Sequence, residues 1–137
     1  MIRLDNQNRK LQAVLAGAVT TSQLPVTVSY VDRMVMPANA PTPFDQTNGA
    51  YKATNTNSAT AVDIAIAPSN NATNIVREID SIEIHNADTV AATVTIQYVD
   101  SATTYILISV ALAVGDTLFY THSTGWEAVD INGNTKR

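Results

Sequence analysis

The stretch "TVTIQYVDSATTYILISVAL", residues 93–112, decides the fold. Its first half alternates polar and apolar side chains, with Val94, Ile96 and Tyr98 on one side, which is typical of a half-buried β-strand. A short polar turn follows, and a second apolar run then returns along the first. We therefore predict a β-hairpin in this part of the chain.

The second strand of this hairpin is expected to have two apolar faces. Tyr105, Leu107 and Ala111 lie on one side, and both faces therefore need cover. A small sandwich has a single core between its sheets, so we expect the extra face, with Tyr105 and Leu107, to contact another chain. The opposite side carries the four aliphatic residues Ile106, Ile108, Val110 and Leu112.

The rest of the chain reads as further short strands. Its 137 residues are enough for one domain, and its β-branched residues favour strands. Turn signals recur every 8–12 residues, which indicates an all-β fold, a single sandwich or jelly-roll-like domain. The apolar pattern changes phase near Asp80 and Ser81, which predicts a β-bulge. Further strands are expected within residues 24–35, 61–68, 74–86, 114–120 and 125–131.

Two segments do not fit a regular strand pattern. Residues 1–22 are predicted to form an N-terminal arm, and residues 23–137 the β-sandwich domain. Residues 36–60 contain three prolines and an Asn-Gly pair without any period, so a long loop is expected there. Phe44 and Tyr51 are the predicted anchors of this loop in a partner surface.

The arm is the main predicted contact between subunits. Its apolar residues fit either a helix or a strand, and the small and β-branched residues that follow favour an extended arm. Such an arm can add a strand to a neighbour, so its deletion is expected to leave the body folded. Its candidate interface residues are Arg3, Leu4, Arg9, Lys10, Leu11, Val14 and Leu15.

Charge is unevenly distributed along the chain. The net charge is −4, but residues 11–135 carry three basic and eleven acidic residues, a net of −8, while both ends are basic. An acidic body argues against a nucleic-acid partner. The basic ends could bind an acidic partner, including another copy of the body, or could simply be solvated. No apolar run is long enough to span a membrane.

No convincing catalytic or metal-binding motif is present. Ser123, His122 and Asp116 could form a triad on paper, but no nucleophile elbow surrounds any serine. The two histidines are too few and too far apart for a zinc site, and there is no cysteine. The aspartates recur at strand edges, where they commonly cap turns. We therefore expect neither an enzyme nor a cofactor.

Trp126 is the single tryptophan and admits two interpretations. On the rim of a sandwich it could stack on a sugar, as in a carbohydrate-binding module. Such sites usually use several aromatic residues, which are only 6% of this chain. A position in the core or at an interface is the favoured interpretation.

Three strings give the chain a resemblance to a known group. "RKLQAVLAGAVTTSQLPVTVSYVD", "HNADTVAATVTIQYVD" and "VGDTLFYTHSTGWEAVDINGNTKR" are similar to small β-rich virion structural proteins of tailed bacteriophages. The resemblance implies a non-catalytic particle component made in the bacterial host cytoplasm. It implies a capsid cement (decoration) protein on the capsid surface, or alternatively a neck, tail or fibre part. Its expected partners are other copies, as a homotrimer, and the major capsid protein or other virion proteins.

Overall fold

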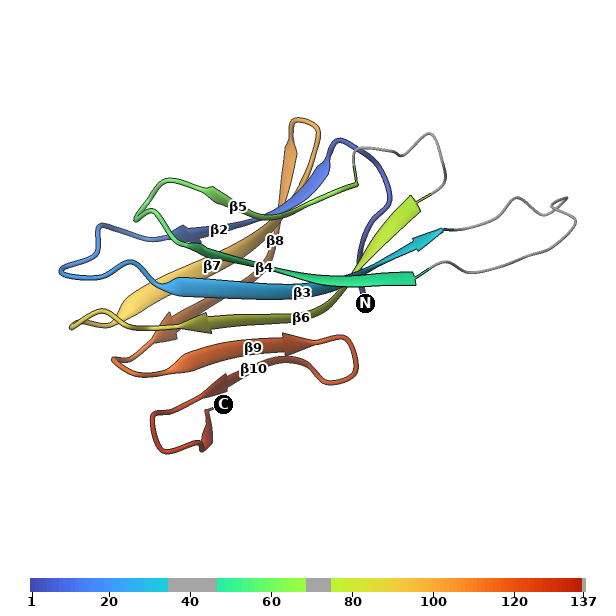
Figure 1. Ribbon diagram of the computed structural model, residues 1–137. Coiled ribbons are helices and arrows are strands. Elements are labelled where there is room, and N and C mark those ends of the chain that lie inside the picture. The colour runs from blue at the N-terminus through green and yellow to red at the C-terminus, as the bar shows by residue number, and fades with distance from the viewer. Residues whose placement is uncertain (35–46, 69–74, 137) are drawn as a thin grey trace, which may run out of the picture.

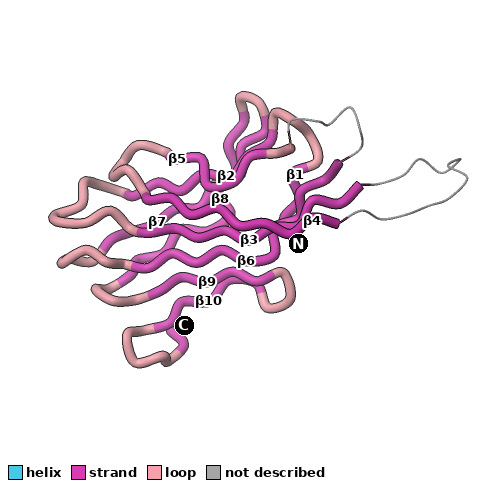
Figure 2. The backbone as a smooth tube through the Cα atoms, in the orientation of Figure 1, coloured by secondary structure: helices cyan, strands magenta, loops and turns pink. Residues whose placement is uncertain are grey.

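The regular structure of the described residues consists entirely of β-strands. The computed structural model describes residues 1–34, 47–68 and 75–136. Its strands form two antiparallel sheets that pack against each other (Figure 1 and Figure 2). The predicted all-β sandwich is therefore confirmed.

The larger sheet has the strand order β11-β10-β9-β6-β3-β4. β1 pairs with residues 77–79 of β6, next to the part of β6 that pairs with β9. Neighbouring strands of this sheet are not always consecutive in the sequence, since β6 lies between β3 and β9. The strands are β1 (Ile2–Leu4), β3 (Pro25–Met34), β4 (Thr47–Asn55), β6 (Ile75–His85), β9 (Thr117–Thr121), β10 (Gly125–Val129) and β11 (Thr135–Lys136).

The smaller sheet has the order β5-β2-β7-β8 and begins and ends on strands without a second partner among the described residues. The β7–β8 pair is the predicted hairpin, turned by Ser101 and Ala102. The strands are β2 (Arg9–Leu15), β5 (Val62–Ile66), β7 (Ala92–Asp100) and β8 (Thr103–Leu112).

Aliphatic side chains from both sheets fill the core between them. Burying one such side chain fully contributes about 1.5–3 kcal/mol, so this layer supplies most of the driving force for folding. The smaller sheet contributes Leu11, Ala13, Leu15, Val94, Ile96 and Leu112, and the larger contributes Leu4, Val26, Val28, Ile79, Ile82, Ile84 and Leu118.

The predicted bulge in β6 is confirmed. Ser29 pairs with Ser81 and the next residue, Tyr30, pairs with Ile79, so Asp80 has no opposite residue on β3. The extra residue keeps both Ile79 and Ile82 in the core although they are an odd number of positions apart.

The predicted N-terminal arm is wrong as a separate element. Residues 1–22 are extended as expected, but β1 pairs with β6, and β2 is an interior strand between β5 and β7. Leu4, Leu11 and Leu15 are buried. The leading segment is therefore part of the sandwich and supplies one of its two central strands in the smaller sheet.

The predicted long loop at 36–60 is also too long. β4 pairs with β3 along nine residues. Asn48 and Gly49, the Asn-Gly pair that favoured a loop, lie within that strand. β4 is an edge strand with many polar residues, so it lacks the apolar alternation that identifies a strand. The part of the predicted loop that includes Phe44 lies outside the described residues.

One carboxylate fixes the connection between β2 and β3. Asp88 is buried in the β6–β7 turn and accepts hydrogen bonds from the backbone N–H groups of Thr20 (2.8 Å) and Thr21 (2.7 Å). Ser22 and Thr89 donate two more backbone bonds to it. These bonds, that from Thr20 foremost, hold the pKa of Asp88 well below its ordinary value.

We expect Asp88→Asn to destabilise the fold and to reduce its acid sensitivity. A folded-state pKa below the unfolded value means that Asp88 stabilises the fold at neutral pH, and that this contribution disappears as the pH falls below about 4. The difference in urea midpoint between wild type and variant should be large at neutral pH and shrink in acid. The exposed carboxylate of Glu83 gives the control, Glu83→Gln. A difference that does not change with pH would contradict this role of Asp88.

Candidate assembly surface

β8 is an edge strand with no charged residue. Among the described residues it pairs only with β7, and its sequence "TTYILISVAL" contains no Lys, Glu or Pro. Proteins usually protect such an edge with charges, prolines or a covering segment, because its free backbone groups can pair with another chain. A ten-residue uncharged edge is therefore a candidate contact surface.

A bulge in β8 changes which side chains face outward. Ile96 pairs with Ile108 and Gln97 pairs with Ile106, so Leu107 has no opposite residue. Ile106 therefore lies on the outer face beside Gln97, which corrects the predicted alternation that placed it with Ile108. The same shift moves Tyr105 to the inner side.

Three consecutive side chains of β8 form an exposed apolar tip. Tyr105, Ile106 and Leu107 are 55%, 69% and 37% exposed, whereas Leu112 at the other end of the strand is fully buried. The tip is next to the β7–β8 turn, which projects at the top of Figure 1 (orange). Exposure of Tyr105 and Leu107 agrees with the expectation that this strand has apolar surface left over, and no residue within the described ranges covers it.

A groove of about 440 Å³ runs between β8 and the last strands of the larger sheet. We call it the β8–β10 groove. The indole of Trp126 packs on Tyr120, with ring centroids 4.8 Å apart and planes at 47°, and is half-buried against the core. The residues that line the groove include Ile108 and Val110 from β8, Leu118 from β9, Trp126 and Ala128 from β10, and Lys136 from β11.

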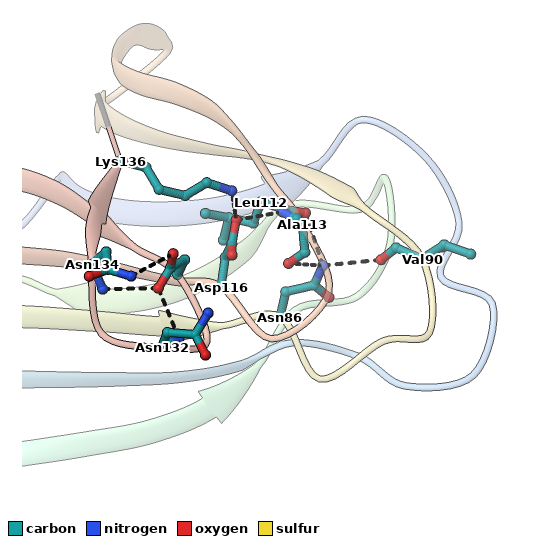
Figure 3. A network of polar contacts seen from close by, with 9 residues as sticks. Asn86, Val90, Leu112, Ala113, Asp116, Asn132, Asn134 and Lys136 are labelled. Atoms are coloured by element: carbon teal, nitrogen blue, oxygen red, sulfur yellow. Dashed lines mark hydrogen bonds and ion pairs between the residues drawn. The ribbon is translucent and has the colours of Figure 1, made fainter.

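A polar network fixes the end of this groove (Figure 3). Asp116, buried in the β8–β9 turn, accepts hydrogen bonds from the backbone of Ala113 (2.8 Å) and from the ammonium of Lys136 (2.5 Å). The bond from Lys136 is the main cause that lowers the pKa of Asp116. Gly115 has φ +82°, and a Cβ there would lie 2.8 Å from Ile131, so only glycine fits this turn. β8, β9 and β11 are thereby held together.

The predicted interface residues of the leading segment are mostly committed within the chain. Leu4, Leu11 and Leu15 lie in the core and are not available to a partner, while Val14 is half-buried on β2. The basic side chains pair with acidic residues of the same body, so they are already neutralised. These pairs are Arg3 with Glu78 (3.3 Å), Arg9 with Asp100 (3.0 Å) and Lys10 with Asp63 (3.0 Å).

Tyr51 stands apart from the other predicted residues. It is 73% exposed on β4, where it pairs with Ser29 on the outer face of the larger sheet. β4 and β8 are edges of different sheets, so Tyr51 does not join the apolar tip.

The three side chains of the triad considered from the sequence each have another partner. His122 contacts Asp80 (3.1 Å), Ser123 contacts Thr121, and Asp116 binds Lys136, so the triad considered from the sequence is not formed. Within residues 1–34, 47–68 and 75–136, no three His, Asp or Glu side chains gather closely enough to hold a metal ion. No helix suited to crossing a membrane occurs in that same part of the chain.

Comparison with known proteins adds no relative: the chain matches no family model, no curated protein and no solved structure.

Proposed function

We propose that the chain is a non-catalytic structural protein of a tailed-phage virion, a capsid cement protein that stabilises the shell by clamping neighbouring capsomers. The observation that carries this proposal is the exposed apolar tip on an uncharged edge strand. A surface of this kind supports association with another protein. The resemblance of the quoted motifs to phage virion proteins supports the choice of particle.

The tip takes over the role first expected of the arm. Since β1 and β2 belong to the sandwich, the contact with the shell is assigned to the body itself, through Tyr105, Ile106 and Leu107. The loops of the body are fixed by the buried side chains of Asn86, Asp88 and Asp116. A rigid body of this kind suits a protein that stabilises a shell. The proposed partners are the major capsid protein and two further copies of this chain.

Ile106→Lys tests the proposal. Because Ile106 is exposed, the substitution should change the free energy of unfolding by less than about 0.5 kcal/mol. A lysine buried in an apolar contact should weaken binding to the particle at least about tenfold, or about 1.4 kcal/mol. Particles lacking the chain should survive heat and osmotic shock less well, and wild-type protein, but not the variant, should restore their resistance when added back.

Val90→Lys provides the matched control, because Val90 is an exposed apolar residue outside the tip. It should restore particle resistance as wild type does. Sedimentation of the free protein should give three times the chain mass of 14.6 kDa for wild type and a lower mass for Ile106→Lys. Particles that are equally resistant with and without the chain would contradict the proposed function.

A further inference from the structure

The two sheets end unevenly on one side of the sandwich. The smaller sheet stops at β8, whereas the larger sheet continues past β9 with β10 and β11. The outer backbone edge of β8 has no strand partner in the described part of the chain. The β8–β10 groove lies at this edge, so a strand added to β8 would have one face towards the groove.

The groove offers apolar side chains and few free polar ones. Ile108, Val110 and Trp126 are half-buried and face it. The polar side chains at the rim of the groove are already hydrogen-bonded within the chain. The free backbone N–H and C=O groups on the outer edge of β8 are therefore the polar groups that a bound segment would meet. The hydrogen bonds at the rim join Lys136 to Asp116 (2.5 Å), Thr135 to Glu127 (2.5 Å) and Thr124 to Thr121 (2.6 Å).

We propose that the β8–β10 groove binds an extended, uncharged segment of a different protein chain, which pairs with β8 as an additional strand. Alternate side chains of such a strand point to the same face, so every second residue would enter the groove beside Trp126. Those residues are apolar because they would meet Ile108, Val110 and Trp126. The segment is uncharged because β8 has no charged residue and the cation of the groove, Lys136, is already paired with Asp116. The carboxylate of Glu127 already accepts a hydrogen bond from Thr135 at the rim. The inference deepens the proposed function, since it names how the body joins its neighbour.

Two other occupants fit less well. A sugar needs free polar side chains and an open aromatic face, but the rim is internally bonded and Trp126 is half-buried against Tyr120. A second β8, paired antiparallel about a two-fold axis perpendicular to the joined sheet, would keep both larger sheets on the same side. The two copies of β10 and β11 would then compete for the same space above the joined strands.

Fluorescence anisotropy with a labelled peptide tests this directly. The probe has the length of β8 and alternates threonine and valine; its control is the same peptide with N-methyl groups on alternate amides, which cannot pair with a strand edge. Ala128→Phe fills the groove without removing core atoms, and Ala111→Phe adds the same ring to the opposite, outer face near the same edge.

We expect the probe to bind wild type and Ala111→Phe within about twofold of each other. N-methylation and Ala128→Phe should each weaken binding at least about tenfold. No binding to wild type, or binding that ignores N-methylation, would overturn the inference. The inference would also be overturned if a sugar oligomer, but not the peptide, bound wild type and failed to bind Ala128→Phe.

The two proposals can fail separately. If the peptide does not bind but wild-type protein restores particle resistance, only the inference about the groove is wrong. If the peptide binds but the protein does not affect particle resistance, only the proposed function is wrong.

Discussion

Deleting residues 1–15 is expected to leave the remaining chain unfolded. The deletion removes β2 from between β5 and β7, so the smaller sheet loses its backbone pairing on both sides of that strand. It also removes β1 from the edge of β6. A sandwich without half of one sheet cannot cover the apolar face of the other.

The magnitude of this loss exceeds the stability of a typical domain. Leu4, Leu11 and Leu15 are all buried, and truncating one core leucine to alanine costs about 2–5 kcal/mol. Three such losses total about 6–15 kcal/mol, against a net stability of about 5–15 kcal/mol for a whole domain. The backbone pairing of β2 is lost in addition. Far-UV circular dichroism and the dispersion of amide NMR signals should both report a disordered chain.

Point variants in β1 test whether the burial of its side chains, and not only the presence of the segment, stabilises the fold. Leu4→Ala should lower the free energy of unfolding by about 2–5 kcal/mol, whereas Arg3→Ala, on the exposed side, should change it by less than about 1 kcal/mol. A peptide of residues 1–15 added to the truncated chain should restore the native spectrum. Cooperative unfolding and native NMR dispersion without residues 1–15 would show that β5 and β7 can close the sheet without β2.

The case of β2 shows what the sequence could and could not predict. The alternation of Leu11, Ala13 and Leu15 was visible, and an extended conformation follows from it. The partner strands were not visible, because Leu11 pairs with Tyr98, far away in the sequence. Local pattern reports which face of a strand is buried, but pairing depends on the shape of the rest of the core.

The candidate assembly surface was predicted in part for the same reason. Two apolar faces on β8 indicated surplus apolar surface, and Tyr105 and Leu107 are indeed exposed. No sequence pattern indicates the bulge at Leu107, so the prediction that Ile106 lies on the same face as Ile108 was wrong. The groove beside Trp126 could not be predicted at all, since it arises from the unequal widths of the two sheets.

Asn86→Ala is expected to cause the largest loss of stability among single substitutions in the loops. Asn86 is 1% exposed, and its amide nitrogen donates to the carbonyls of Val90 (3.0 Å), Leu112 (3.0 Å) and Ala113 (3.1 Å) (Figure 3). Its carbonyl oxygen accepts from the backbone N–H of Asp88 (3.0 Å). One side chain thus connects the turn before β7 to the end of β8.

The cost follows from the groups that alanine would leave without a partner. The bonds to the Leu112 carbonyl and from the Asp88 N–H are buried, and each orphaned buried group costs about 1–3 kcal/mol. We therefore expect a loss of about 2–4 kcal/mol, measured from urea unfolding with an unchanged m-value. Asn132→Ala is the control, because Asn132 lies in an exposed turn, and it should change stability by less than about 0.5 kcal/mol. Equal midpoints for the two variants would mean that water replaces the amide of Asn86, and that the β8 end of the groove is held by Asp116 and Lys136 alone.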